Sequence, residues 1–159
     1  MSFLTTDLYD ANEGRVAVVE PMFRAYGGRA RFAGQVVTLK VYEDNTRVRE
    51  VLAEPGQGKI LVVDGGGSKR CALLGDQIAE LAVKNGWEGV VVYGCIRDSV
   101  AINALDIGVR ALDTNPKKTV KRNEGQRDLV LAFGAVEFVP GHWLYVDEDG
   151  LLLSATPLL

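Results

Sequence analysis

The chain has 159 residues and a net charge of −3, with 47% hydrophobic and 25% charged residues, which suits a single globular domain spanning residues 1–159. Eighteen Lys and Arg against 21 Asp and Glu leave no broad basic surface for phosphates, so we expect no direct contact with nucleic acid. No apolar run reaches the ~20 residues of a membrane helix, and the N-terminal residues lack the segments of a signal peptide, so we expect a cytoplasmic protein without a membrane partner.

The first part of the chain is expected to alternate between helices and strands. In chain order the elements are a short helix at 5–12, a strand or buried loop at 16–19, a loop at 24–31, a strand at 34–42, a helix at 46–54, a strand at 59–64 and a short strand at 70–73. In the 34–42 segment, Val37, Leu39 and Val41 alternate with Thr38 and Lys40, which predicts one buried and one polar face.

A helix and a buried strand between residues 73 and 98 form the unit around which the rest is organised. The apolar positions at helical spacing are Leu74, Ile78, Leu81 and Ala82. Asn85 and Gly86 tolerate the left-handed conformation and so predict the end of this helix. Residues 89–94 form a β-branched run bounded by glycines, which is typical of a strand covered on both faces.

The rest of the chain is predicted to be richer in strands. A helix is expected at 100–105 and a strand at 109–113, followed by short apolar runs at 129–132, 135–139, 143–146 and 151–154 that turn residues separate. The sequence shows no repeat, linker or low-complexity segment. We therefore predict one mixed α/β domain.

Two short segments could carry chemistry. Gly75 and Asp76 open the central helix, whose unpaired N–H groups and dipole can hold an anion. The alternative is that Gly75 ends a loop and Asp76 only caps the helix. Arg97 and Asp98 directly follow the 89–94 strand, where a guanidinium can grip a carboxylate and an aspartate can bind a hard cation. The alternative for this pair is a surface ion pair. One helix, one turn and one strand separate Asp76 from Arg97, so we expect both segments to share one rim.

Other candidates are weaker. The lysines near glycines at 56–59 and 65–69 do not match a P-loop, and His142 is expected to have a surface role in a turn. Cys71 and Cys95 lack metal-ligand spacing; a disulfide between them stays open, with free thiols favoured. The only basic cluster, Lys117, Lys118, Lys121 and Arg122, is interpreted as a solvated loop.

Three segments resemble the RraA-like family, which is named for a regulator of ribonuclease activity and also contains class II 4-hydroxy-4-methyl-2-oxoglutarate aldolases. They are KILVVDGGGSKRCALLGDQIAELAVKNGWEGVVVYGCIRD at 59–98, VRAL at 109–112 and PGHWLYVDEDGLLLS at 140–154. The resemblance implies an α/β fold, specifically a swivelling β/β/α domain with a mixed-sheet core. It also implies a ring-shaped homotrimer with sites between subunits.

The resemblance also implies roles for individual residues. Those expected to bind a small oxo-acid substrate are Gly75, Asp76, Gln77, Ile78 and Arg97. Arg97 would polarise the substrate and Asp98 would ligate a divalent cation, Mg²⁺ or Mn²⁺, while Asp76 would hold water on that cation. Arg97 and Asp76 are thus the expected catalytic residues.

Two departures from the aldolase pattern keep two functions open. An acidic residue is expected three positions after Asp98, where this chain has Ala101, and the C-terminal segment that supplies a carboxylate to the neighbouring subunit is expected to be longer than this chain, which stops at Leu159. The first function is a metal-dependent lyase that cleaves 4-hydroxy-4-methyl-2-oxoglutarate to pyruvate and decarboxylates oxaloacetate. The second is a non-catalytic trimer that binds and inhibits an endoribonuclease of the RNA degradosome.

Overall fold

The computed structural model describes residues 2–159. Its helices are α1 (Thr5–Ala11), α2 (Thr46–Leu52), α3 (Asp76–Lys84) and α4 (Ser99–Asn103). Its strands are β1 (Val16–Val18), β2 (Arg24–Tyr26), β3 (Phe32–Lys40), β4 (Lys59–Asp64), β5 (Ala72–Leu74), β6 (Gly89–Ile96), β7 (Gly108–Thr114), β8 (Gln126–Arg127), β9 (Leu131–Phe133), β10 (Val136–Phe138), β11 (Trp143–Asp147) and β12 (Gly150–Ser154).

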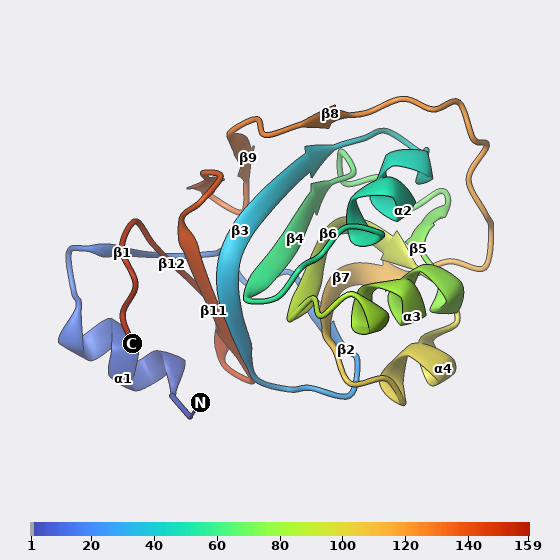
Figure 1. The fold of residues 1–159 in the computed structure, drawn as a ribbon. Coiled ribbons are helices and arrows are strands. Elements are labelled where there is room, and N and C mark those ends of the chain that lie inside the picture. The colour runs from blue at the N-terminus through green and yellow to red at the C-terminus, as the bar shows by residue number, and fades with distance from the viewer. Residues whose placement is uncertain (1) are drawn as a thin grey trace.

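Most strands belong to one mixed sheet with the order β1-β12-β11-β3-β4-β6-β7-β2. The central neighbours β3, β4, β6 and β7 run parallel, and β5 pairs in parallel with β6. The outer pairs are antiparallel. Helices α2, α3 and α4 lie together on one side of the parallel strands (Figure 1), as crossover connections between parallel strands require. The predicted mixed α/β class is confirmed.

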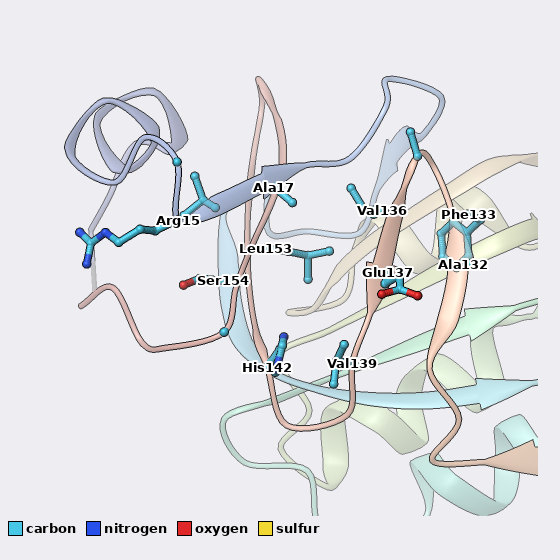
Figure 2. A pocket seen from close by; sticks show the side chains of 14 residues that line it. Arg15, Ala17, Ala132, Phe133, Val136, Glu137, Val139, His142, Leu153 and Ser154 are labelled. Atoms are coloured by element: carbon cyan, nitrogen blue, oxygen red, sulfur yellow. The ribbon is translucent and has the colours of Figure 1, made fainter.

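The C-terminal strands cover the face of the parallel strands opposite to the helices. The β9–β10 hairpin stands apart from the main sheet and faces β1 and β12 across an open trough (Figure 2). Helix α1 packs beside β11 and β12, near the C-terminus (Figure 1). The predicted strand-rich second half is thus correct, and it covers the sheet face that the helices leave open.

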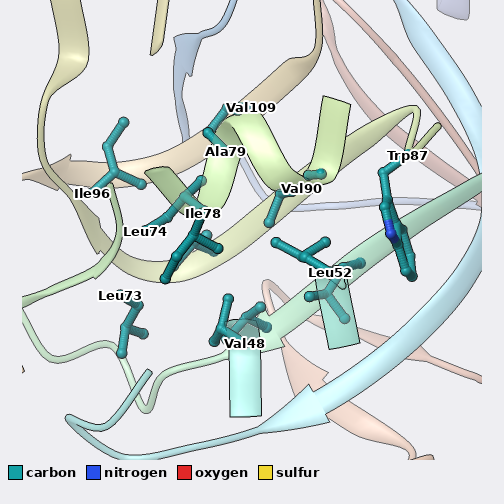
Figure 3. Packing of buried hydrophobic residues seen from close by; sticks show 14 of the residues in the cluster. Val48, Leu52, Leu73, Leu74, Ile78, Ala79, Trp87, Val90, Ile96 and Val109 are labelled. Carbon is teal, nitrogen blue, oxygen red and sulfur yellow. The ribbon is translucent and has the colours of Figure 1, made fainter. Parts of the chain in front are cut away.

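The parallel strands are buried on both faces. Beneath the helices, Val48 and Leu52 of α2 and Ile78 of α3 pack over Val90 of β6 (Figure 3). On the other face Val91 packs in a second cluster with residues of the β9–β10 hairpin. Both valines are fully buried, and each such side chain contributes about 1.5–3 kcal/mol. The predicted two-sided burial of residues 89–94 is confirmed, and β6 continues two residues further, to Ile96.

Several predictions of secondary structure and burial are wrong because contacts between segments far apart in the sequence decide the outcome. The segment predicted as a loop at 24–31 contains β2, which forms because it pairs with β7 at the sheet edge. Thr38, assigned to a polar face, is fully buried because the segment after β8 covers it, and its hydroxyl donates to the carbonyl of Leu129 at 2.7 Å. In α3 the buried apolar residues are Ile78, Ala79 and Ala82, whereas Leu81 is half-buried.

Cys71 and Cys95 are free and buried, as favoured from the sequence. Burial raises the pKa of both thiols, which keeps them protonated and unreactive. Between residues 2 and 159, none of the helices has the length and apolar character needed to cross a membrane.

Candidate functional site

The two predicted segments meet at one edge of the sheet. Strands β5 and β6 run parallel, so the chain leaves both at the same edge, and the N–H of Arg97 donates to the carbonyl of Leu74 at 2.9 Å. The start of α3 therefore lies beside the turn between β6 and α4. The structure brings Gly75 and Arg97 together, as the sequence predicts.

Gly75 permits a close approach between these segments. The main-chain N–H of Asp76 donates to Oδ2 of Asp98 at 3.1 Å. A Cβ atom at position 75 would lie only 2.9 Å from the same Oδ2 and 3.5 Å from Nε of Arg97. The missing side chain therefore leaves the space that the Asp98 carboxylate occupies.

Asp98 adopts a left-handed backbone conformation, with φ 57° and ψ 41°. Its carbonyl accepts the N–H of Ile102 at 2.9 Å and so begins α4. This conformation costs a residue other than glycine about 1 kcal/mol, although Asp tolerates it better than most. In this conformation the Asp98 carboxylate lies beside Gly75, where the hydrogen bond from the Asp76 N–H holds it.

These residues line a cavity of about 250 Å³. All the residues predicted from the sequence face it: Gly75, Asp76, Gln77, Ile78, Arg97 and Asp98. It is completed by residues that the sequence analysis did not assign to a site: Asn45, Thr46, Arg49, Ala72, Lys118 and Lys121. The cavity is therefore built from four parts of the chain: α2 with the residue before it, β5 with the first turn of α3, the turn after β6, and a segment after β7.

Cationic side chains outnumber carboxylates in the wall of this cavity. Arg49, Arg97, Lys118 and Lys121 line it, against Asp76 and Asp98. With the N–H groups at the start of α3, this surplus of positive charge favours an anion with more than one negative charge. The clustering of basic residues at 117–122 is visible in the sequence, but its position over the site is not.

Lys118 and Lys121 belong to an irregular segment, residues 115–125, which we call the strap. Asp44 is only 1% exposed, and its carboxylate accepts the main-chain N–H groups of Arg122 at 2.8 Å and Glu124 at 3.1 Å. Burial would raise the pKa of Asp44, but the hydrogen bonds from Thr46, Glu124 and Arg122 outweigh it and lower the pKa to about 2. Asp44 is therefore ionised near neutral pH, and its carboxylate holds the strap.

The donor set fits a hard cation that keeps much of its hydration. Across residues 2–159 no group of three or more His, Cys, Asp or Glu side chains is arranged to hold a metal ion. Mg²⁺, however, is commonly held by one or two carboxylates together with water and substrate oxygens. Asp98 provides one carboxylate in the cavity wall, with Oδ2 engaged by the Asp76 N–H, and Asp76 provides the second.

The trough between the β9–β10 hairpin and strands β1 and β12 is larger than this cavity but differs from it in shape and lining. The trough in Figure 2 has a volume of about 770 Å³ and is open along its length. Its wall is largely apolar, with Ala17, Leu153 and Val136 pointing into it, and His142 at one end is half-buried. Arg15, Glu137, His142 and Ser154 also line the trough, but a site for a small molecule encloses most of its ligand, which the smaller cavity can do and the open trough cannot.

The chain is similar throughout its length to known proteins. A family model described as RraA-like: Aldolase/RraA matches residues 5–153. A protein of Laribacter hongkongensis, provisionally named 4-hydroxy-4-methyl-2-oxoglutarate aldolase, is 59% identical over 159 residues, covering 100% of both chains.

Solved structures give two further descriptions. The structure described as the RNA-processing inhibitor RraA from Thermus thermophilis matches with a TM-score of 0.95 and 48% identity, covering 99% of this chain and 95% of that chain. A Geobacillus kaustophilus structure described as S-adenosylmethionine: 2-dimethylmenaquinone methyltransferase matches with a TM-score of 0.96 and 46% identity. The match covers 98% of this chain and 97% of that chain. These similarities span every segment that lines the cavity.

Proposed function

We propose, because this chain belongs to the RraA-like family, that it is a metal-dependent lyase of small oxo-acids with two carboxylates. Its reactions would be cleavage of 4-hydroxy-4-methyl-2-oxoglutarate to pyruvate and decarboxylation of oxaloacetate. The observation that carries the proposal is the shared cavity in which the start of α3, Arg97 and Asp98 meet. The name of the Laribacter relative supports the choice of substrate.

The cavity can hold both ends of such a substrate. The N–H groups at the start of α3 and the guanidinium of Arg97 are donors for the 2-oxo-carboxylate end. Arg49, Lys118 and Lys121 provide positive charge for the second carboxylate. A substrate with one carboxylate would leave part of this charge uncompensated, so the site favours dianions.

The reaction places negative charge where these donors lie. In the aldol cleavage the 4-hydroxyl loses its proton, the C3–C4 bond breaks, and its electron pair passes to the 2-oxo group as the enolate of pyruvate. Protonation of C3 then completes the second pyruvate. Arg97 stabilises the enolate oxygen, and the Asp76 carboxylate is the group in the wall suited to move the proton. A divalent cation at Asp98 would supply Lewis-acid stabilisation of the same charge.

Oxaloacetate requires the same stabilisation. Loss of its C4 carboxylate as carbon dioxide leaves the electron pair on C3, again as the enolate of pyruvate, which then takes up one proton. The two activities therefore need one binding geometry and no additional residue. By contrast, the methyl donor S-adenosylmethionine carries a positive sulfonium centre, which the surplus of cationic side chains in this cavity disfavours.

A second candidate is inhibition of an endoribonuclease by a non-catalytic homotrimer. The Thermus relative is described as an RNA-processing inhibitor. Ala101 favours this alternative, because it is exposed on α4 one turn after Asp98 and provides no acid there. In this case an acidic surface of the ring would meet a basic segment of the partner.

A coupled assay for oxaloacetate decarboxylation, with and without Mn²⁺, tests the lyase. We expect turnover that requires the metal ion and falls by at least about a hundredfold in Arg97→Ala, comparable to loss of one oxyanion donor. Glu80→Ala, on the exposed side of α3, is the control and should keep full activity. Absence of turnover in the wild-type protein, together with capture of a purified endoribonuclease, would overturn the lyase and support the inhibitor.

A further inference from the structure

We infer that Asp44 is a positioning residue for the dianion site, because it fixes the strap that carries Lys118 and Lys121 relative to α2. This inference rests on the proposed function, since it concerns recognition of the second carboxylate. Asp44 itself contacts neither the cavity nor, by the proposal, the substrate. It would act through the two lysines.

The strap, residues 115–125, needs tethers because it has no regular structure of its own. It leaves β7 at Thr114 and reaches β8 at Gln126, and of its side chains only that of Thr119 is buried. A segment with few buried contacts is held mainly by its hydrogen bonds to the rest of the protein. The position of the two lysines therefore depends on these bonds.

Asn115 and Pro116 bind the rest of the protein at the start of the strap, and three further tethers hold it around the lysines. Before Lys118, the carbonyl of Lys117 accepts the N–H of Ala72 at 2.8 Å. Between the lysines, the hydroxyl of Thr119 donates to Oδ1 of Asn45 at 2.8 Å. After Lys121, the strap binds Asp44. Each lysine is thus flanked by a tether on either side.

The Asp44 tether joins two walls of the cavity. Oδ1 accepts the N–H of Thr46 at 2.9 Å and its hydroxyl at 2.6 Å, at the start of α2. Oδ2 accepts the N–H groups of Arg122 and Glu124 in the strap. Four donors converge on this side chain, and only an ionised carboxylate accepts from all of them. One carboxylate therefore sets the strap lysines against the α2 wall with Arg49.

Loss of this tether should affect substrate binding more than the chemical step. Asp44→Asn replaces one accepting oxygen with an NH₂ group that faces N–H donors, which releases the strap or α2. Asp98 stays tied to α3, and the main-chain N–H of Arg97 stays bonded to Leu74. The Arg97 guanidinium donates to the carbonyl of Pro116, but this is the start of the strap, which Asn115 holds independently of Asp44. We expect KM for oxaloacetate to rise about tenfold with little change in kcat, because ordering the lysines then has to accompany binding.

The experiment compares Asp44→Asn with Asp147→Asn in the full chain. Asp147 is a matched control because it is 4% exposed and accepts N–H and hydroxyl bonds from Thr5, but lies outside the cavity. Kinetics with oxaloacetate and Mn²⁺ are measured with hydrogen exchange at the strap amides. Thr119→Val, which removes an independent tether, replaces Asp44→Asn if the latter does not fold.

The expected result is an increased KM and faster exchange in the strap for the Asp44 and Thr119 variants, with an unchanged KM for Asp147→Asn. If Asp44→Asn folds and its KM matches that of Asp147→Asn, the inference is overturned while the proposed function stands. If the wild-type protein itself shows neither turnover nor calorimetric binding of oxaloacetate, the proposed function fails and the inference falls with it.

Discussion

The main-chain N–H of Asp76 donates to Oδ2 of Asp98 at 3.1 Å, and this bond ties the first turn of α3 to the end of β6. It orients a carboxylate whose backbone is in the left-handed region, and it does so across a gap that only glycine at position 75 leaves open. Three features thus coincide at one rim: a helix amide that has no partner within its own helix, a glycine without a side chain, and an aspartate in a left-handed conformation.

Gly75→Ala should abolish the activity with little effect on stability. The φ of Gly75 is −120°, which alanine adopts readily, but the added Cβ would push against the Asp98 carboxylate and Arg97. We expect kcat/KM for oxaloacetate to fall at least about a hundredfold, as misplacement near the chemistry can cause, with the urea midpoint almost unchanged. Full activity of this variant would show that the close approach is irrelevant to catalysis.

Asp98→Asn should lose the divalent cation and keep the fold. Asparagine tolerates the left-handed conformation and has nearly the same volume, but provides no charge for the ion. We expect calorimetric titration with Mn²⁺ to show at least about tenfold weaker binding. Asp98→Ala should bind as weakly and be less stable by about 1 kcal/mol. An unchanged titration in either variant would refute Asp98 as the metal ligand.

Ala101→Glu should increase the activity if the missing acid limits the site. Position 101 follows Asp98 by three residues on α4 and is exposed, so a glutamate fits there and lies on the same side of the helix. We expect tighter Mn²⁺ binding and a higher kcat than wild type. No gain in either quantity would count against this explanation, and Val100→Glu, on a different side of α4, controls for added charge.

Replacing both Lys118 and Lys121 with alanine should weaken discrimination in favour of dianions. The strap lysines provide positive charge for the second carboxylate, so KM for oxaloacetate should rise about tenfold or more, and its dependence on salt should decrease. The control is Lys84→Ala, at the far end of α3 from the cavity. An unchanged KM in the double variant would place the second carboxylate elsewhere.

Asp44 should contribute to stability in a pH-dependent way. Its pKa falls from 3.8 to about 2 on folding, which corresponds to roughly 2 kcal/mol of stability. Because the folded pKa is the lower one, this contribution is present above pH 4 and is lost as the pH falls toward 2. The stability difference between wild type and Asp44→Asn, from urea unfolding, should therefore shrink from pH 6 to pH 3. A constant difference would contradict the assignment.

The sequence predicts the geometry at the rim because that geometry follows from local patterns. The β-branched run at 89–94, the apolar spacing of α3 and the helix stop at Asn85 identify a helix and a buried strand, and parallel pairing then brings Gly75 beside Arg97. The prediction that Lys118 and Lys121 are solvated is correct, since both are exposed. The sequence does not show that they also line the cavity, because Asp44, many residues away in the chain, holds the segment that carries them. Long-range hydrogen bonds of this kind leave no periodic signal in the sequence.

The most direct test of one shared site is calorimetric titration of oxalate, a planar dianion that resembles the enolate of pyruvate, in the presence of Mg²⁺. Gly75→Ala and Arg97→Ala change different elements of the chain but the same cavity. We predict that wild type binds oxalate and that each variant binds at least about tenfold more weakly. Affinity equal to wild type in either variant would contradict the account.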